Sequence, residues 1–239
     1  MKNKKDYQLT DKGYAYRYPR AAVTADSVIF GFDGRRLQVL LIQRGIEPYK
    51  GYWALPGGFM NMDESIDECA FRELREETTL EPEQMEQFGV FSSVDRDPRG
   101  RVMTVAFYAL VKKSNVRGGD DAQDAQWFDI DQLPRLAFDH REIIAEGLNA
   151  LSRDIRFEPV GFRLLADEFS MPQLQRLYEA ILGMNFDRRN FQKKMLASGI
   201  IQPIGSKEKG EKGRGGNLYH FDQTGYEELK HNTPLRSEF

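Results

Sequence analysis

Three glutamates, Glu73, Glu76 and Glu77, stand at the spacing i, i+3 and i+4, so a helix through this segment would gather their carboxylates on its surface. Like charges at such spacings repel one another by roughly 0.2–0.5 kcal/mol per pair. The group suits a hard cation, because Mg²⁺ takes carboxylate oxygens together with the phosphate oxygens of a substrate. The alternative is a solvated acidic face with ion-pair partners such as Arg72, and the surrounding residues distinguish the two.

These glutamates belong to a longer pattern. After Gly58, five residues lead to Glu64 and seven more lead to Arg72, which is followed directly by ELREETTL, ending at Leu80. The pattern resembles the Nudix box, G-x5-E-x7-R-E-U-x-E-E-x-G-U, in which U is an aliphatic residue. Thr79 stands where the box has glycine, and the other fixed positions match. The chain is therefore identified as a member of the Nudix fold family.

The resemblance implies an α/β/α sandwich in which the box forms a loop, a helix and a second loop. It also implies that Glu73, Glu76 and Glu77 hold a divalent metal, while Arg72 orients the glutamates and Glu64 braces the loop. The reaction of the family is attack of water on a nucleoside diphosphate that is linked to a further group. The metal neutralises the charge that develops on the phosphate.

Thr79 is the one departure from the box. A glycine just after a helix accepts a left-handed conformation, which a β-branched residue resists by about 1–2 kcal/mol. We therefore expect the helix either to end differently or to carry strain, and a shift of the metal ligands would impair catalysis. No catalytic residue is expected: the box residues are interpreted as remnants, no cofactor is required, and Mg²⁺ matters only if hydrolase activity is retained.

A second group of chemically distinctive residues lies near the C-terminus. Ser170 and Gln173 predict a capping box at the start of one helix, and Asp187 can cap a second helix, RRNFQKKMLAS, which Gly199 ends. IIQPI and LYHF predict two strands on either side of a glycine-rich basic segment at 205–217. This order of elements predicts a winged helix-turn-helix.

The C-terminal module is basic although the whole chain carries a net charge of −3. Residues 185–217 include eight Lys or Arg and three Asp or Glu, which gives +5. Arg and Asn side chains suit the base edges of guanine and adenine, and Lys suits the phosphates, so the module is expected to bind DNA. The alternative is a basic helix that is only solvated. The candidate DNA-binding residues are Arg188, Arg189, Asn190, Lys193 and Lys194 in the helix and Lys207, Lys209, Lys212 and Arg214 in the wing.

The first 155 residues alternate between strand and helix patterns. Strands are predicted at 22–32, 37–44, 103–111 and 125–134, and helices at about 63–78 and 138–155. The period then becomes purely helical after a short extended link. We therefore expect an α/β Nudix sandwich (α/β/α) at 1–155, as an effector-sensing domain, and a winged helix-turn-helix DNA-binding domain at 156–239.

A Nudix domain joined to a winged helix is similar to the Nudix-related transcriptional regulators. The resemblance covers essentially the whole chain and includes VDRDPRGRVMTVAFYALV, LAFDHREII and LYEAILGMNFDRRNFQKKM. It implies that the Nudix domain senses an effector and that a homodimer binds a double-stranded DNA operator. Members respond to ADP-ribose or to a free sugar, and this chain looks most like the arabinose-responsive branch, which implies L-arabinose or another pentose as effector.

A sugar effector needs carboxylates, amides and arginines in a concave site. The candidates are Arg44, Lys50, Trp53, Asp95, Arg96, Asp97, Asp139 and His140. Each has a simpler alternative: Arg44 can end its strand in solvent, Trp53 can belong to the core, and DRDPRG can be only a turn. His140 follows Asp139 at a helix start, which favours a hydrogen-bonding role there over catalysis.

The sequence therefore predicts an effector-responsive repressor of sugar catabolism. The competing hypothesis is a Mg²⁺-dependent pyrophosphohydrolase that acts on ADP-ribose or a related nucleotide sugar. No apolar run approaches the ~18 residues that a membrane span needs, so no membrane partner is expected. The single cysteine, Cys69, is expected in the core and fits the reducing cytoplasm, where we place the protein.

Overall fold

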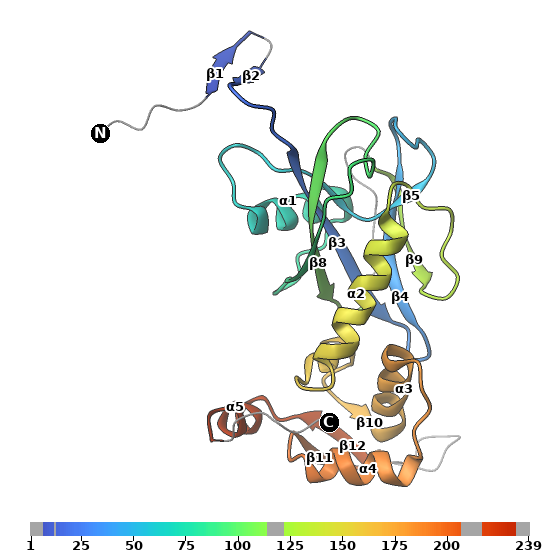
Figure 1. Cartoon of the computed structure of the whole chain (residues 1–239). Helices are drawn as coiled ribbons and strands as arrows, with labels where there is room; N and C mark the ends of the chain where they lie inside the picture. The colour runs from blue at the N-terminus through green and yellow to red at the C-terminus, as the bar shows by residue number, and fades with distance from the viewer. Residues whose placement is uncertain (1–6, 12, 114–121, 207–216, 233–239) are drawn as a thin grey trace.

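The computed structural model describes residues 7–11, 13–113, 122–206 and 217–232. Two parts of the molecule follow one another along the chain, a sheet covered by helices and a smaller helical part (Figure 1). A short hairpin of β1 (Tyr7–Thr10) and β2 (Gly13–Tyr16) precedes them and projects from the body. No helix in the described ranges is long and apolar enough to cross a membrane.

A seven-stranded mixed sheet forms the centre of the first part. Its path runs β5-β4-β3-β8-β7, with β6 paired to β3 and β9 paired to β4. Strands β3 and β8 are parallel, and the other pairs are antiparallel. The strands are β3 (Ala22–Phe32), β4 (Leu37–Arg44), β5 (Trp53–Ala54), β6 (Gly57–Phe59), β7 (Glu86–Phe91), β8 (Val102–Leu110) and β9 (Ala122–Asp129).

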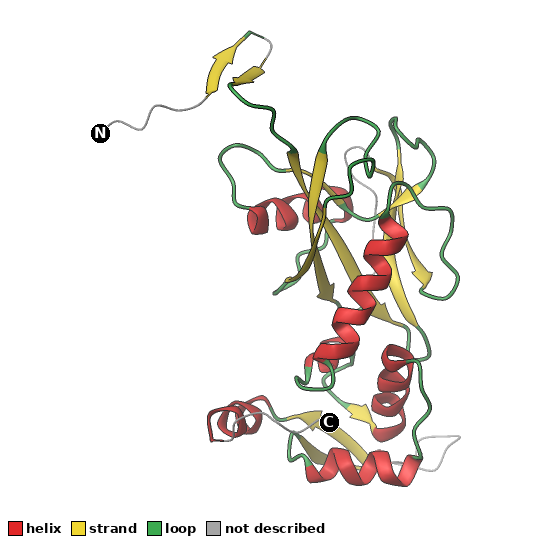
Figure 2. Cartoon of the chain, viewed as in Figure 1, coloured by secondary structure: helices red, strands yellow, loops and turns green. Residues whose placement is uncertain are grey.

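Helices α1 (Ile66–Thr78) and α2 (His140–Asp154) cover opposite faces of this sheet (Figure 2). Alternation along β3 explains why, because successive side chains of a strand point to opposite sides. Ala25 and Ile29 lie in the two clusters on the side of α1, whereas Val28 and Phe30 pack with residues of α2. The expected α/β/α sandwich is therefore confirmed.

The start of α1 differs slightly from the predicted 63–78. The helix begins at Ile66 because Ser65 is its N-cap: the Ser65 hydroxyl accepts from the Glu68 N–H, and the Glu68 carboxylate accepts from the Ser65 N–H. This reciprocal capping box satisfies two backbone donors and fixes the helix start. Cys69 is fully buried on the inner face, as expected.

The second part is a winged helix-turn-helix, as predicted. The capping box at Ser170 and the left-handed Gly183 delimit α3, and Asp187 caps α4 by accepting from the Asn190 N–H at 2.9 Å. The hairpin strands β11 and β12 are present, and β10 joins them in the order β10-β12-β11. The elements are η1 (Val160–Leu164), β10 (Phe169–Ser170), α3 (Met171–Leu182), α4 (Arg188–Ala197), β11 (Ile201–Ser206), β12 (Asn217–Phe221) and α5 (Gln223–Asn232).

The two parts share one apolar core. Leu151 and Ile155 at the end of α2 are fully buried and belong to the same cluster as Leu177 and Ile181 of α3. The Ser152 hydroxyl also donates to the Ile181 carbonyl at 3.0 Å. The winged helix is thus packed directly onto α2, and the domain boundary between residues 155 and 156 stays a prediction.

Candidate functional site

A cavity of about 280 Å³ opens between the box and the start of α2. It is lined by parts of β3, β4, β6 and α1, by Arg96, Asp97 and Arg99 after β7, and by Phe138 and His140. Its charged lining consists of Asp26, Arg44, Arg72, Glu73, Glu77, Arg96, Asp97 and Arg99. Four acids and four arginines make this a polar site for a polar ligand.

Arg72 lies among the carboxylates of the box. Its guanidinium donates to Glu64 at 2.7 and 2.8 Å, to Glu73 at 2.8 Å and to Glu76 at 3.0 Å. Glu64 also accepts from the Asn61 N–H at 2.7 Å, which ties the loop to the helix. The Arg72 hydrogen bond lowers the pKa of Glu64 to about 2. Arg72 therefore compensates much of the repulsion that the glutamate spacing creates.

Glu73 and Glu77 are held against the two glycines that precede the box helix. The Glu77 carboxylate accepts from the Gly57 N–H at 2.8 Å, and burial raises the pKa of Glu77 to about 8. A Cβ on Gly58 would lie 2.4 Å from Glu73 Oε1, so only glycine permits this approach.

The carboxylates of the box were the expected metal ligands. In the arrangement seen here, Arg72 holds Glu73 and Glu76, and Glu77 is bonded to the backbone. Among the residues that the structure describes, no group of three or more His, Cys, Asp or Glu is placed to hold a metal ion. Arg72 and the Gly57 N–H thus engage carboxylate oxygens that a cation would need, and metal binding by Glu73, Glu76 and Glu77 stays a prediction.

Thr79 adopts the conformation that the box normally gives to glycine. Its φ and ψ of 63° and 11° are left-handed, and its N–H donates to the Arg75 carbonyl at 2.9 Å. Of the two outcomes expected from the substitution, the structure shows the strained one, with a β-branched residue in the left-handed region. The neighbouring Thr78 hydroxyl, which donates to the Leu74 carbonyl and accepts from the Leu80 N–H, further fixes this turn.

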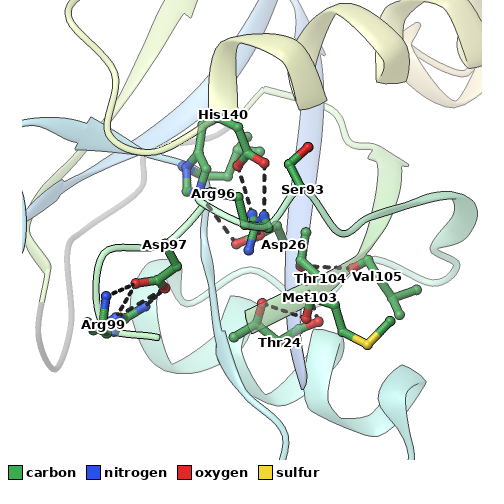
Figure 3. Close-up of polar contacts among 12 residues, drawn as sticks. Thr24, Asp26, Ser93, Arg96, Asp97, Arg99, Met103, Thr104, Val105 and His140 are labelled. Carbon is green, nitrogen blue, oxygen red and sulfur yellow. Dashed lines mark hydrogen bonds and ion pairs between the residues drawn. The ribbon is translucent and has the colours of Figure 1, made fainter. Parts of the chain in front are cut away.

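A buried polar network lies where β3, residue 96 and α2 meet (Figure 3). The Arg96 side chain, only 3% exposed, donates from Nε and Nη2 to the two carboxylate oxygens of Asp139, at 2.8 Å each, and from Nη2 to Asp26 at 3.3 Å. His140 accepts from the Leu55 N–H at Nδ1, 2.8 Å away, and burial lowers the pKa of His140. His140 is therefore a neutral hydrogen-bonding residue at the helix start.

An aromatic and guanidinium cluster forms the cavity rim. The Arg99 guanidinium, bonded to the buried Asp97 carboxylate, lies 4.8 Å from the ring centre of Phe59 and 5.4 Å from that of Phe138. Arg44 lies 5.0 Å from the Phe138 ring. Phe138 has a φ of 49°, which is rare for a bulky residue and is a mark of functional sites.

The structure brings together only part of the predicted effector-binding set. Arg44, Arg96, Asp97 and His140 line the cavity, and Asp139 reaches it through Arg96. Lys50, Trp53 and Asp95 are not in the lining: Lys50 and Asp95 are exposed, and Trp53 packs edge-on against Phe128 at 4.6 Å, as its core alternative requires. Ligand contact stays a prediction for the whole set.

Three residues of the rim were absent from the sequence prediction, namely Phe59, Arg99 and Phe138. Arg99 lies within the DRDPRG segment that supplied Arg96 and Asp97, so the same segment could have indicated it. The two phenylalanines carry no comparable local signal, since Phe59 and Phe138 are 79 positions apart and only the fold brings both to the cavity.

The basic face of α4 is the second candidate site. Phe191 and Met195 are buried, and Phe191 packs against Tyr178 of α3 with ring centres 5.6 Å apart. All five helix candidates are exposed on the other side: Arg188, Arg189, Asn190, Lys193 and Lys194. The wing candidates Lys207, Lys209, Lys212 and Arg214 lie outside the described residues.

Comparison with known families defines the class of this protein. Residues 20–147 match the NUDIX domain, and residues 161–221 match the NrtR DNA-binding winged helix domain. The chain therefore belongs to the Nudix family and, within it, to the proteins that carry an NrtR-type winged helix.

Its relatives include regulators and enzymes. The chain is 34% identical over 226 residues to the "ADPR responsive transcriptional repressor NtrR" of Acinetobacter baylyi, covering 92% of this chain and 88% of that protein. It is 43% identical over 129 residues to the "ADP-ribose pyrophosphatase" of Methanocaldococcus jannaschii, covering 54% of this chain and 74% of that protein.

The structure of Shewanella oneidensis NrtR in complex with a 27mer DNA is similar over nearly the whole chain. Its TM-score is 0.72 at 28% identity, and the match covers 91% of this chain and 99% of that one. The NUDIX domain of the same protein, in complex with ADP ribose, matches at a TM-score of 0.53 and 34% identity, covering 56% of this chain and 90% of that chain. The expected arabinose branch has no support among these relatives.

Proposed function

We propose that this protein is a transcriptional repressor that binds operator DNA through its winged helix and releases it when ADP-ribose occupies the Nudix pocket. The observation that carries the proposal is the similarity, over 88% of its length, to a relative named as an ADPR responsive repressor. The exposed basic face of α4 and the polar cavity supply the two surfaces that such a protein needs.

The pocket chemistry favours ADP-ribose over a pentose. The guanidinium groups of Arg44 and Arg99 lie 5.0 and 5.4 Å from the centre of the Phe138 ring, so the rim offers positive charge for a diphosphate next to aromatic side chains that a purine can contact. The carboxylates of Asp26 and Asp97 can accept hydrogen bonds from ribose hydroxyls. A free pentose brings no charge to these arginines and no base to the ring.

The assembly and location expected for such a repressor remain proposals. A homodimer with two winged helices would read a palindromic operator with half-sites about one or two helical turns apart. A cytoplasmic location follows from action on DNA and agrees with one buried thiol, Cys69.

A DNA-release experiment tests this function. A duplex is first selected with the protein from a random-sequence pool, and its affinity is then measured with and without ADP-ribose or L-arabinose. We expect ADP-ribose to weaken binding roughly tenfold or more, a usual size for allosteric coupling, and L-arabinose to have no effect. Release by L-arabinose alone would overturn the effector assignment.

A second candidate function is hydrolysis of ADP-ribose. It is favoured by the 43% identity to an ADP-ribose pyrophosphatase and by the glycine-like turn at Thr79, which leaves the box helix in place. Incubation with ADP-ribose and Mg²⁺, followed by detection of AMP and ribose 5-phosphate, tests it. Turnover near ~10 s⁻¹, typical of enzymes, together with no salt-sensitive DNA binding, would favour the enzyme over the repressor.

A further inference from the structure

Helix α2 is attached to the pocket at its N-cap residue. Asp139 occupies the N-cap position, where an aspartate side chain normally accepts a hydrogen bond from the first turn of the helix. Here the Asp139 side chain makes no capping bond. Both carboxylate oxygens instead accept from Arg96, at 2.8 Å each. A pocket arginine therefore holds the helix start.

Arg96 is a shared cation. It lies in the cavity lining and serves two carboxylates, Asp139 bidentately and Asp26 at 3.3 Å, in a buried setting. One guanidinium thus serves two carboxylates, and its Nη2 donates to both of them. A phosphate that enters the cavity competes with these carboxylates for the Arg96 guanidinium. If Arg96 turns to the phosphate, Asp139 loses its partner, and the start of α2 is free to move.

The residue before Asp139 is poised for such a movement. Phe138 has a φ of 49°, which a bulky side chain resists, and its ring is held by the guanidinium groups of Arg44 and Arg99. A ligand that displaces these contacts removes part of what holds the strained conformation, while Tyr49 and His140 still pack against the ring. Loss of the bond between Arg96 and Asp139 and relief of the backbone strain at Phe138 would both act on the N-terminal end of α2.

The other end of α2 touches the DNA-binding module. Helix α2 is 15 residues long, or about 22 Å, and Figure 1 shows it crossing the sheet towards α3. The Ser152 hydroxyl donates to the Ile181 carbonyl in the last turn of α3, and α3 carries α4 through the contact of Tyr178 with Phe191. A helix moves as a rigid rod, so a shift at Asp139 reaches α4 through packed contacts.

We propose that the bond between Arg96 and Asp139 couples the pocket to DNA binding. Without ligand, it fixes α2 in the position that supports operator binding. A ligand phosphate takes Arg96 from Asp139, and the freed helix shifts the winged helix. Asp139 is thus a positioning residue that never needs to touch the ligand. This inference rests on the proposed ADP-ribose-responsive repression.

The variant Asp139→Asn tests the coupling because it should change the affinities for ADP-ribose and for DNA in opposite directions. Because it removes the competitor for Arg96, we expect it to bind ADP-ribose several-fold more tightly and to bind the selected duplex roughly tenfold more weakly without ligand. The ratio of DNA affinities without and with ADP-ribose should fall from roughly tenfold to less than about twofold. General damage to the fold would weaken both affinities.

Asp67→Asn is the matched control, because Asp67 is an exposed aspartate in the first turn of α1 and does not line the cavity. It should behave as the wild type in both titrations. The coupling would be overturned if Asp139→Asn bound ADP-ribose and still showed the wild-type ratio of DNA affinities without and with ADP-ribose. That result would leave the proposed function intact. An unchanged DNA affinity in the wild-type protein on addition of ADP-ribose would instead overturn the proposed function and the coupling together.

A second variant decides the matter if Asp139→Asn does not fold. Ser152→Ala removes the bond to Ile181 at the far end of α2 and leaves the pocket untouched. We expect an unchanged dissociation constant for ADP-ribose and a ratio of DNA affinities that is reduced several-fold. An unchanged ratio would overturn transmission through α2.

Discussion

Helices α1 and α4 both gather like charges at helical spacing, but the charges meet different surroundings. In α1 the carboxylates meet Arg72 within the protein, and Glu73 and Glu77 are packed against glycines of the cavity wall. In α4 the basic side chains are exposed, and none forms an ion pair with another described residue. The carboxylates of α1, which are paired within the protein, indicate a preformed internal site. The basic side chains of α4, which have no ion-pair partner among the described residues, indicate a surface that binds an external polyanion.

The largest effect is expected where charge is uncompensated. Arg189→Ala should lower affinity for the selected duplex by roughly 1–3 kcal/mol and relax its sequence preference, because an arginine reads base edges. Lys194→Ala, as the control, should weaken binding to every duplex alike and reduce the salt slope by about one ion. Salt-dependent titrations with selected and random duplexes measure both. Equal loss of discrimination in the two variants would contradict these roles.

Within the pocket, Arg99 tests whether the rim serves the ligand. Arg99→Ala should weaken ADP-ribose binding by roughly 1–2 kcal/mol, because a charged hydrogen bond and a stacking surface are lost. Because Arg99 also contacts the Phe138 ring, DNA affinity without ligand should fall, but by less than in Asp139→Asn. Calorimetric titration of ADP-ribose measures the effect, and Arg101→Ala, at an arginine outside the cavity lining, is the control. An unchanged ADP-ribose affinity would place the diphosphate elsewhere.

The stability of the region around the cavity should also depend on pH, whereas DNA binding by α4 should depend mainly on salt. Burial lowers the pKa of His140 below the 6.5 of the unfolded chain, so below pH 6.5 the unfolded state binds a proton that the folded state refuses. Stability from this group is present above pH 6.5 and should fall by about 1 kcal/mol per pH unit below it. His140→Asn keeps an acceptor for the Leu55 N–H, so the stability of the wild type relative to this variant should fall between pH 7.5 and 5.5 in urea unfolding, since the buried Glu77 carboxyl acts in the opposite direction but equally in both proteins. An identical fall in both proteins would assign the acid sensitivity to other groups.

The smallest effect is expected at the end of α1. Thr79→Gly should stabilise the protein by about 1 kcal/mol, since glycine adopts φ near 63° without strain. The melting temperature should rise by roughly 2–4 °C for a chain of this size. Hydrolysis of ADP-ribose with Mg²⁺ should be the same in both proteins, because the helix exit is already glycine-like. A large gain of hydrolysis in Thr79→Gly would show that the threonine had silenced the box.

Much of the architecture was accessible from the sequence because its signals are local. The box spacing, the capping box at Ser170 and the cap at Asp187 each depend on a few neighbouring residues, and all appear as predicted. Helix α5 and the hairpin of β1 and β2 were not predicted. Their segments are short, and neither carries a strong apolar period.

The candidate site was only partly accessible. Arg96 and Asp97 were found because they share one polar turn, but the role of Asp139 depends on a bond across 43 positions of the chain. Phe138 lies at the rim with a left-handed backbone, and its residue type does not predict that conformation. The preference for a pentose came from general similarity, and the arginines around the Phe138 ring argue for a charged ligand instead.

The core shared by α2 and α3 has a consequence for how such chains can be recombined. A Cβ on Gly161 would lie 2.8 Å from the Ile155 side chain, so even the join between the two parts is tightly fitted. A winged helix taken from a relative would therefore have to bring side chains that match Leu151 and Ile155. The two parts should therefore unfold as one cooperative unit, in a single calorimetric transition.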